Sequence, residues 1–178
     1  MRTCFSLWLA TALTALAAAQ APSTAAAGGA PAATAVWEMD MYVELALWQR
    51  PPQAIDTSRF DGLLPLSVRL DLELQPDGRL HFLVAPRRAA KPGSFGALPS
   101  FAVPADGHYR VSAGSPIWLD VVNSATGENV KSSSFEMQAH SVLRKCVVFP
   151  LKAGVRYTLQ ISGSAQPSAS VLITPDAR

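Results

Sequence analysis

Cysteine and histidine are scarce in this chain of 178 residues, which has two cysteines and three histidines. Cys4 precedes an apolar run that is typical of a secretory signal, so Cys146 alone would remain after processing. One thiol cannot close an internal disulfide, and a scaffold held together by disulfides is therefore excluded. Because Cys146 lies in an apolar segment, we expect it to be buried as a small hydrophobic side chain.

An excess of charge of one sign is also lacking. Without residues 1–19 the chain keeps 14 Lys and Arg against 13 Asp and Glu, because only Arg2 is lost from the charged residues. This balance gives no strongly basic domain, so we expect no nucleic-acid partner. No later segment has about 18 consecutive apolar residues, so we expect no membrane span after removal of the signal.

The N-terminal residues indicate export. Arg2 is followed by an apolar run that ends in small residues, which predicts a signal peptide over 1–19 and a periplasmic or secreted product. Residues 20–35 are almost entirely Ala, Gly, Pro, Ser and Thr, and predict a flexible leader. The length of the remaining segment, 36–178, suits a single domain that is stable without covalent cross-links.

Alternation of apolar and polar residues predicts strands along most of this domain. It predicts a long strand over 37–48, with a helix as the alternative because Met, Glu, Leu and Ala favour helices. Alternation over 66–74, the turn at Pro76-Asp77-Gly78 and the apolar segment 80–84 predict a hairpin. Further short strands are expected at 98–103, 108–113, 117–123, 130–135, 142–149, 157–162 and 169–174. This pattern predicts an all-β fold, an antiparallel β-sandwich or jelly roll of about eight to nine strands.

Two segments of this region share one pattern, in which an aromatic residue, a glycine turn and a tyrosine follow one another. They are Phe101-x-Val-Pro-Ala-x-Gly-x-Tyr-x-Val and Val147-x-Phe-x-Leu-x-Ala-Gly-x-x-Tyr-x-Leu. Together with Trp118-Leu119-Asp120-Val121, they resemble the bacterial pre-peptidase C-terminal domain over roughly residues 98–164. The resemblance implies a module without catalytic activity that is linked to export or to the binding of polymers.

A second resemblance rests on Lys91-Pro92-Gly93-Ser94-Phe95-Gly96, Trp118 and Arg144-Lys145. This set is similar to a family of small exported proteobacterial proteins, some of which are described as homogentisate 1,2-dioxygenases. The resemblance implies an alternative function, a metal-dependent dioxygenase that would bind iron.

Iron chemistry of this kind needs His and carboxylate ligands that converge on one open site. The available histidines are His81, His108 and His140, which lie in three separate segments outside any ligand cluster. We therefore expect no metal cofactor, with iron at these histidines as the alternative and calcium as an alternative structural ion. His108 lies in a glycine turn and is expected to be exposed. No serine lies in a Gly-x-Ser-x-Gly elbow either.

The first candidate binding group centres on Asp120, which shares a predicted strand face with Trp118. A carboxylate buried in an apolar strand needs a partner. Arg144 and Lys145, on another apolar strand, are the expected ion-pair partners. If this pair opens onto a groove beside Trp118, it would bind a polar ligand.

The second candidate group is a loop rich in Pro and Gly that carries Arg87, Arg88 and Lys91. Such cations are either solvated or recognise an anionic polymer. Trp48 is the tryptophan that we expect to be most exposed, which makes it a candidate platform for sugar rings. These features predict binding rather than catalysis, with a polysaccharide or another exported protein as the partner.

Overall fold

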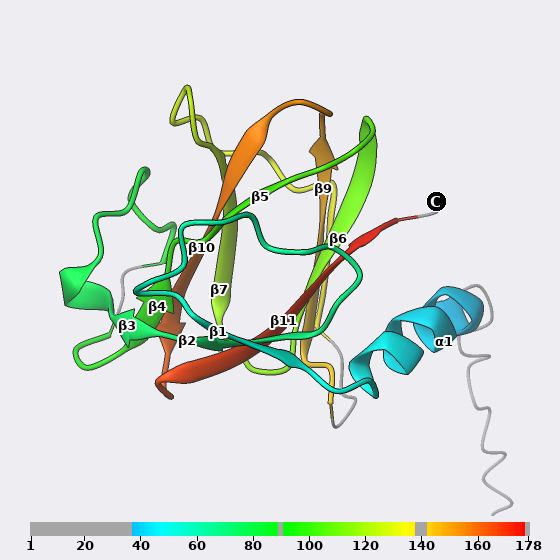
Figure 1. The fold of residues 1–178 in the computed structure, drawn as a ribbon, viewed down its shortest axis with the longest axis horizontal. Coiled ribbons are helices and arrows are strands. Elements are labelled where there is room, and N and C mark those ends of the chain that lie inside the picture. The colour runs from blue at the N-terminus through cyan, green and yellow to red at the C-terminus, as the bar shows by residue number, and fades with distance from the viewer. Residues whose placement is uncertain (1–36, 89–90, 138–141, 177–178) are drawn as a thin grey trace, which may run out of the picture. The chain divides into compact units, whose positions relative to one another are not determined.

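The computed structural model describes residues 37–88, 91–137 and 142–176, in which it contains eleven strands and one α-helix (Figure 1). One sheet has six strands, in the order β1 (Gln53–Asp56), β2 (Leu70–Glu73), β11 (Ser168–Pro175), β6 (Gly107–Ala113), β9 (Lys145–Leu151) and β8 (Ser134–Met137). The other contains β3 (Gln75–Pro76), β4 (Phe95–Ala97), β10 (Arg156–Ser164), β5 (Ser100–Ala102) and β7 (Trp118–Asn123). The predicted signal peptide and leader lie outside the described residues.

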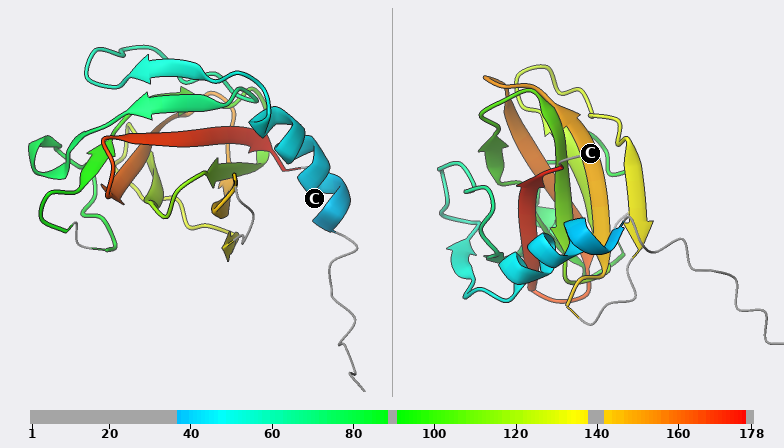
Figure 2. Two further views of the ribbon diagram at one scale, coloured as in Figure 1. Left: turned by 90° about the horizontal axis from the view of Figure 1, so that it is seen from below. Right: turned by 90° about the vertical axis from the view of Figure 1, so that its right-hand side faces the viewer.

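The two sheets stack face to face and enclose one apolar core (Figure 2). Strand side chains alternate between the two faces of a sheet, so Val111 and Ile173 of the first sheet meet Leu159 and Val121 of the second. Each of these side chains is fully buried. All strand pairs are antiparallel except that of β1 with β2, which confirms the predicted antiparallel β-sandwich.

Strand β10 is the centre of the second sheet. It pairs with β7 along one edge and with β4 and then β5 along the other. Between β4 and β5 the Leu159 amide donates a hydrogen bond to the Pro99 carbonyl at 2.9 Å. A proline has no amide hydrogen to give to the ladder, so β4 ends before Pro99 and, of the strand predicted at 98–103, only β5 at 100–102 forms.

The strand predicted over 37–48 is wrong, because these residues form the helix α1 (Trp37–Trp48). Within α1, Glu44 and Trp48 are four residues apart and both are 2% exposed, which places them on one helix face. That face covers the outer side of the first sheet, and α1 crosses β11 and β6 in the right-hand view of Figure 2. In the sequence of α1, apolar residues recur at every second position, a pattern that predicts a strand although these residues form a helix.

Polar residues buried beneath α1 join the helix to the first sheet. The Glu44 carboxylate accepts hydrogen bonds from Ser112 and, at 2.9 Å, from Thr174. Arg110 lies 3.8 Å from Glu44 and donates to Asp176 at 2.7 Å. The side chains of all three charged residues are at most 5% exposed, so Arg110 neutralises carboxylates that have little access to water.

The predicted hairpin over 66–84 is also wrong. Strand β2 belongs to the first sheet, and β3 belongs to the second, so the chain crosses between the sheets at Leu74. A 3-10 turn, η1 (Asp77–Arg79), follows, and residues 80–84 form no strand. Within the described part of the chain, no helix is long and apolar enough to cross a membrane.

Candidate functional site

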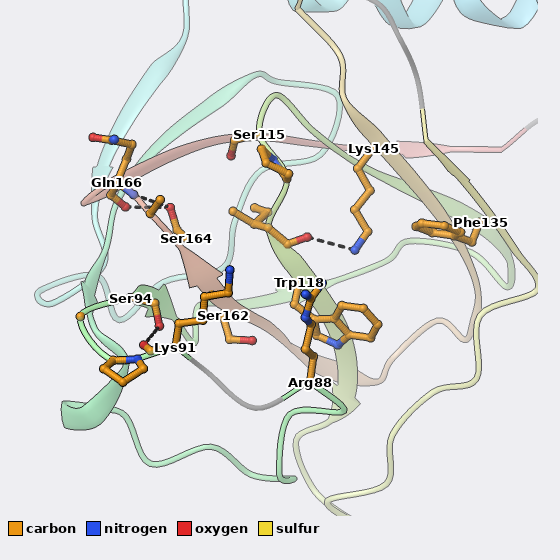
Figure 3. Close-up of a pocket in the computed structure, with 16 residues that line it drawn as sticks. Arg88, Lys91, Ser94, Ser115, Trp118, Phe135, Lys145, Ser162, Ser164 and Gln166 are labelled. Carbon is orange, nitrogen blue, oxygen red and sulfur yellow. Dashed lines mark hydrogen bonds between the residues drawn. The ribbon is translucent and has the colours of Figure 1, made fainter.

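The candidate site consists of two hollows that share Trp118, Phe135 and Lys145 as walls. Figure 3 shows the residues that line the larger of the two. The large hollow has a volume of about 680 Å³ and extends from these three residues to the loop before β4 and the turn between β10 and β11. The small hollow, of about 190 Å³, lies between β7 and β9 and includes Arg87 and Asp120. A hollow of several hundred Å³ is large enough for a small molecule or a unit of a polymer.

Lys145 stands at the junction of the two hollows and is only 5% exposed. Its Nζ donates to the Ile117 carbonyl oxygen at 3.0 Å, as the dashed line in Figure 3 shows. The ammonium lies 4.6 Å from the ring centroid of Trp118 and 5.3 Å from that of Phe135, so both aromatic faces attract it. Burial lowers the pKa of Lys145, and the nearby Asp120 carboxylate counteracts this shift in part.

Asp120 lies two residues after Trp118 in β7, and its carboxylate fixes the orientation of the Trp118 ring. Trp118 Nε1 donates to Asp120 Oδ2 at 2.8 Å, and Asn129 Nδ2 donates to Oδ1 at 3.4 Å. Arg87 Nε lies 4.0 Å from Oδ1. Arg144 has an exposed side chain and is not an ion-pair partner of Asp120 among the described residues, so the prediction that it would be is wrong. Arg87 of the loop is instead the cation that pairs with Asp120.

Gln160 of β10 attaches the basic loop, which carries Arg87, Arg88 and Lys91, to the second sheet. Its Oε1 accepts hydrogen bonds from the amides of Leu83 at 2.8 Å and Val84 at 3.2 Å, and its Nε2 donates to the Val84 carbonyl at 3.1 Å. The Gln160 side chain thus makes the hydrogen bonds to the backbone of residues 83–84 that a neighbouring strand would otherwise make. Because Arg87 and Arg88 follow within four residues, Gln160 determines where these cations enter the hollows.

Asp77 attaches the other end of the loop. Its Oδ2 accepts hydrogen bonds from the Ser94 hydroxyl at 2.6 Å and from the Gly163 amide at 3.0 Å. Gly163 has a φ of 72° and lies where the register between β10 and β4 shifts, a backbone conformation that suits glycine. Asp77 therefore joins η1, the start of β4 and the end of β10 behind the wall of the large hollow.

Six of the eight predicted binding residues line these hollows: Trp118, Asp120, Lys145, Arg87, Arg88 and Lys91. Arg144 does not, and neither does Trp48, whose predicted exposure is wrong. Trp48 is 2% exposed, and its Nε1 donates to Ser112 at 3.3 Å beneath α1. The burial predicted for Cys146 in β9 is confirmed.

The histidines of the dioxygenase alternative do not converge among the described residues. His81 and His108 are exposed, as predicted for His108, and lie in separate segments, whereas His140 falls outside the described residues. In the ranges 37–88, 91–137 and 142–176 no three His, Cys, Asp or Glu side chains are grouped closely enough to hold a metal ion.

Comparison with known proteins adds no relative: no family model matches the chain, and no curated protein or solved structure matches it significantly. The two resemblances drawn from sequence motifs therefore stay predictions. Function has to be inferred from the residues of the hollows themselves.

Replacing Gln160 with leucine is expected to release the basic loop. The variant would leave the amides of residues 83–84 without their acceptor, at a cost of about 1–3 kcal/mol where these groups stay buried. Limited trypsin digestion would detect the change as faster cleavage after Arg87 and Arg88. Replacement of the exposed Gln53 with leucine is the matched control. Equal cleavage rates in the two variants would show that Gln160 does not hold the loop.

Proposed function

We propose that the protein is an exported, non-catalytic β-sandwich that binds a polysaccharide through the large hollow, in the periplasm or outside the cell. The observation that carries this proposal is the fixed Trp118 ring, which Asp120 orients through Nε1 and Lys145 contacts through its face. Binding sites for small ligands and polymer units combine such an apolar ring with a few convergent polar groups. Since the ring is already held, little conformational entropy would be lost on binding.

The polar groups of the large hollow suit binding better than catalysis. The Ser94 hydroxyl lies 2.6 Å from both Asp77 Oδ2 and the Lys91 carbonyl, and Ser164 donates to the Gln166 carbonyl at 2.7 Å. These serines have acceptors in the protein but no histidine base, because no histidine lines the hollow within the described ranges. A serine without a base is a weak nucleophile at neutral pH.

Replacing Trp118 with alanine is expected to weaken polysaccharide binding at least tenfold. The reason is that a central aromatic side chain contributes about 2 kcal/mol or more at a binding site. Isothermal titration against a panel of acidic and neutral polysaccharides would measure the change, with Trp118→Phe as a variant that keeps an aromatic ring. Tyr42→Ala is the matched control, because Tyr42 is a 67% exposed aromatic on α1, away from the hollows.

Two results would contradict the proposal. One is the absence of binding to every polysaccharide of the panel by the folded protein. The other is equal weakening by Trp118→Ala and Tyr42→Ala, which would place the binding surface elsewhere.

A further inference from the structure

The charged side chains that line the large hollow are all positive among the described residues. Arg88, Lys91 and Lys145 contribute to its wall, and no acidic side chain lines it among the residues that the structure describes. Two carboxylates near the large hollow are engaged elsewhere: Asp120 faces the small hollow with Trp118 and Arg87 as partners, and Asp77 is buried behind the wall. The three cations of the large hollow therefore have no counter-ion within it.

Of these three cations, Lys145 most needs a counter-ion. An ammonium group has three N–H donors, and only the Ile117 carbonyl accepts a hydrogen bond from it within the described part of the protein. The Trp118 and Phe135 rings, and the nearby Asp120 carboxylate, compensate in part for the water that Lys145 has lost. A charged group at 5% exposure without an ionic partner in contact is costly, and an anion that enters the hollow would remove that cost.

Arg88 and Lys91 differ from Lys145 because their side chains are exposed. Exposed cations attract an anion over distance but add little affinity each, because water and salt screen them. A buried ammonium acts at short range and in a lower dielectric, where the same charge interacts more strongly. The hollow thus combines outer cations that attract a polyanion with one buried cation that can hold a single anionic group.

From this arrangement we infer that the polysaccharide is acidic, and that Lys145 pairs with one of its anionic groups while the sugar contacts Trp118. The inference rests on the proposed function, which it makes specific. The anionic group is a carboxylate of a uronic acid or a sulfate ester, and both would accept hydrogen bonds from the two remaining N–H groups of Lys145.

The test compares polygalacturonate, dextran sulfate and uncharged dextran as probes of the purified full-length mature protein. We expect the acidic probes to bind and Lys145→Met, which keeps the apolar stem, to weaken that binding at least tenfold. Arg144→Met is the matched control, because it removes the adjacent but exposed charge outside the hollows. The preferred probe distinguishes carboxylate from sulfate. Equal binding of dextran, or equal affinities of the two variants, would overturn the inference.

A pH titration of the unmodified protein tests the same inference without a substitution. The free protein has a lowered pKa at Lys145, and a bound anion would raise it towards the ordinary value of 10.5. Affinity should therefore be highest at lower pH and fall as pH rises through the lowered pKa of the free protein. Among the described residues, the other charged groups that line the two hollows are Asp120, Arg87, Arg88 and Lys91. The fall in affinity must therefore disappear in Lys145→Met to be assigned to Lys145. A fall that persists in that variant would contradict the inference.

The outcomes separate this inference from the proposed function. Binding of a neutral polysaccharide that depends on Trp118 but not on Lys145 would keep the proposed function and overturn the inference. Binding of polyglutamate alone, with the same loss in Lys145→Met, would keep Lys145 as an anion site and overturn the assignment to polysaccharides.

Discussion

Replacing Arg110 with methionine should lower the free energy of unfolding by about 3–5 kcal/mol, the usual cost of removing one partner of a buried ion pair. Arg110 lies between Glu44 of α1 and Asp176 after β11, and all three side chains are almost completely buried. Without the guanidinium, two carboxylates would stay close together in a region with little water. Urea unfolding would measure the loss, which is a large part of the stability of a typical domain.

Two further variants make this prediction specific. Arg144→Met removes an exposed arginine from the neighbouring segment and should change stability by no more than about 0.5 kcal/mol. Adding Glu44→Gln and Asp176→Asn to Arg110→Met should restore part of the lost stability, because these substitutions remove the two buried negative charges that Arg110 had neutralised. A loss below about 1 kcal/mol in Arg110→Met would show that this group does not hold α1 to the sheet.

Replacing Gly96 with alanine should destabilise the fold by about 3 kcal/mol or more, because the backbone of β10 blocks the new methyl group. A Cβ at this position would overlap the Ile161 carbonyl oxygen and the Asp77 Oδ1 oxygen. The first belongs to the β-ladder and the second to the side chain that positions Ser94 and Gly163, so neither can move without disturbing the wall of the large hollow. The variant should also lose polysaccharide affinity.

Gly78→Ala is the matched control for this variant. Nothing lies within 4 Å of a Cβ at Gly78, and its backbone is not in the left-handed region. Thermal unfolding followed by circular dichroism should therefore show a large fall in Tm for Gly96→Ala and almost none for Gly78→Ala. Similar Tm values would mean that the second sheet can open at β4 to accept a side chain.

The parts of the fold that the sequence predicts well are those in which local pattern and burial agree. Strands β6, β7, β10 and β11 coincide closely with predicted segments because their alternation places one residue set in the core. The prediction failed for α1, because its apolar residues recur at every second position in the sequence and only contacts with β6 and β11 show which face is buried. It also failed after β2, since the crossing between sheets depends on tertiary contacts that no turn motif indicates.

Several residues of the candidate site were predicted from the sequence, but their arrangement was not. The apolar context of Asp120 and Lys145 indicated buried charges that need partners, and the loop cations were evident from composition. Arg144 and Lys145 were predicted as the ion-pair partners of Asp120, and Arg87 was not, because the sequence does not show that Gln160 holds the basic loop against β10. Phe135 and Gln160 gave no signal at all, since an aromatic and an amide in strands are ordinary surface or core residues.

The most direct test of the binding site is the indole N–H resonance of Trp118 during titration of the protein with polygalacturonate. Trp48 provides an internal reference, because its indole N–H donates to Ser112 beneath α1 and lines neither hollow. If the polysaccharide binds in the large hollow, the Trp118 resonance should shift saturably while the Trp48 resonance stays unchanged. A Trp118 resonance that stays in place while the polysaccharide binds would contradict our account.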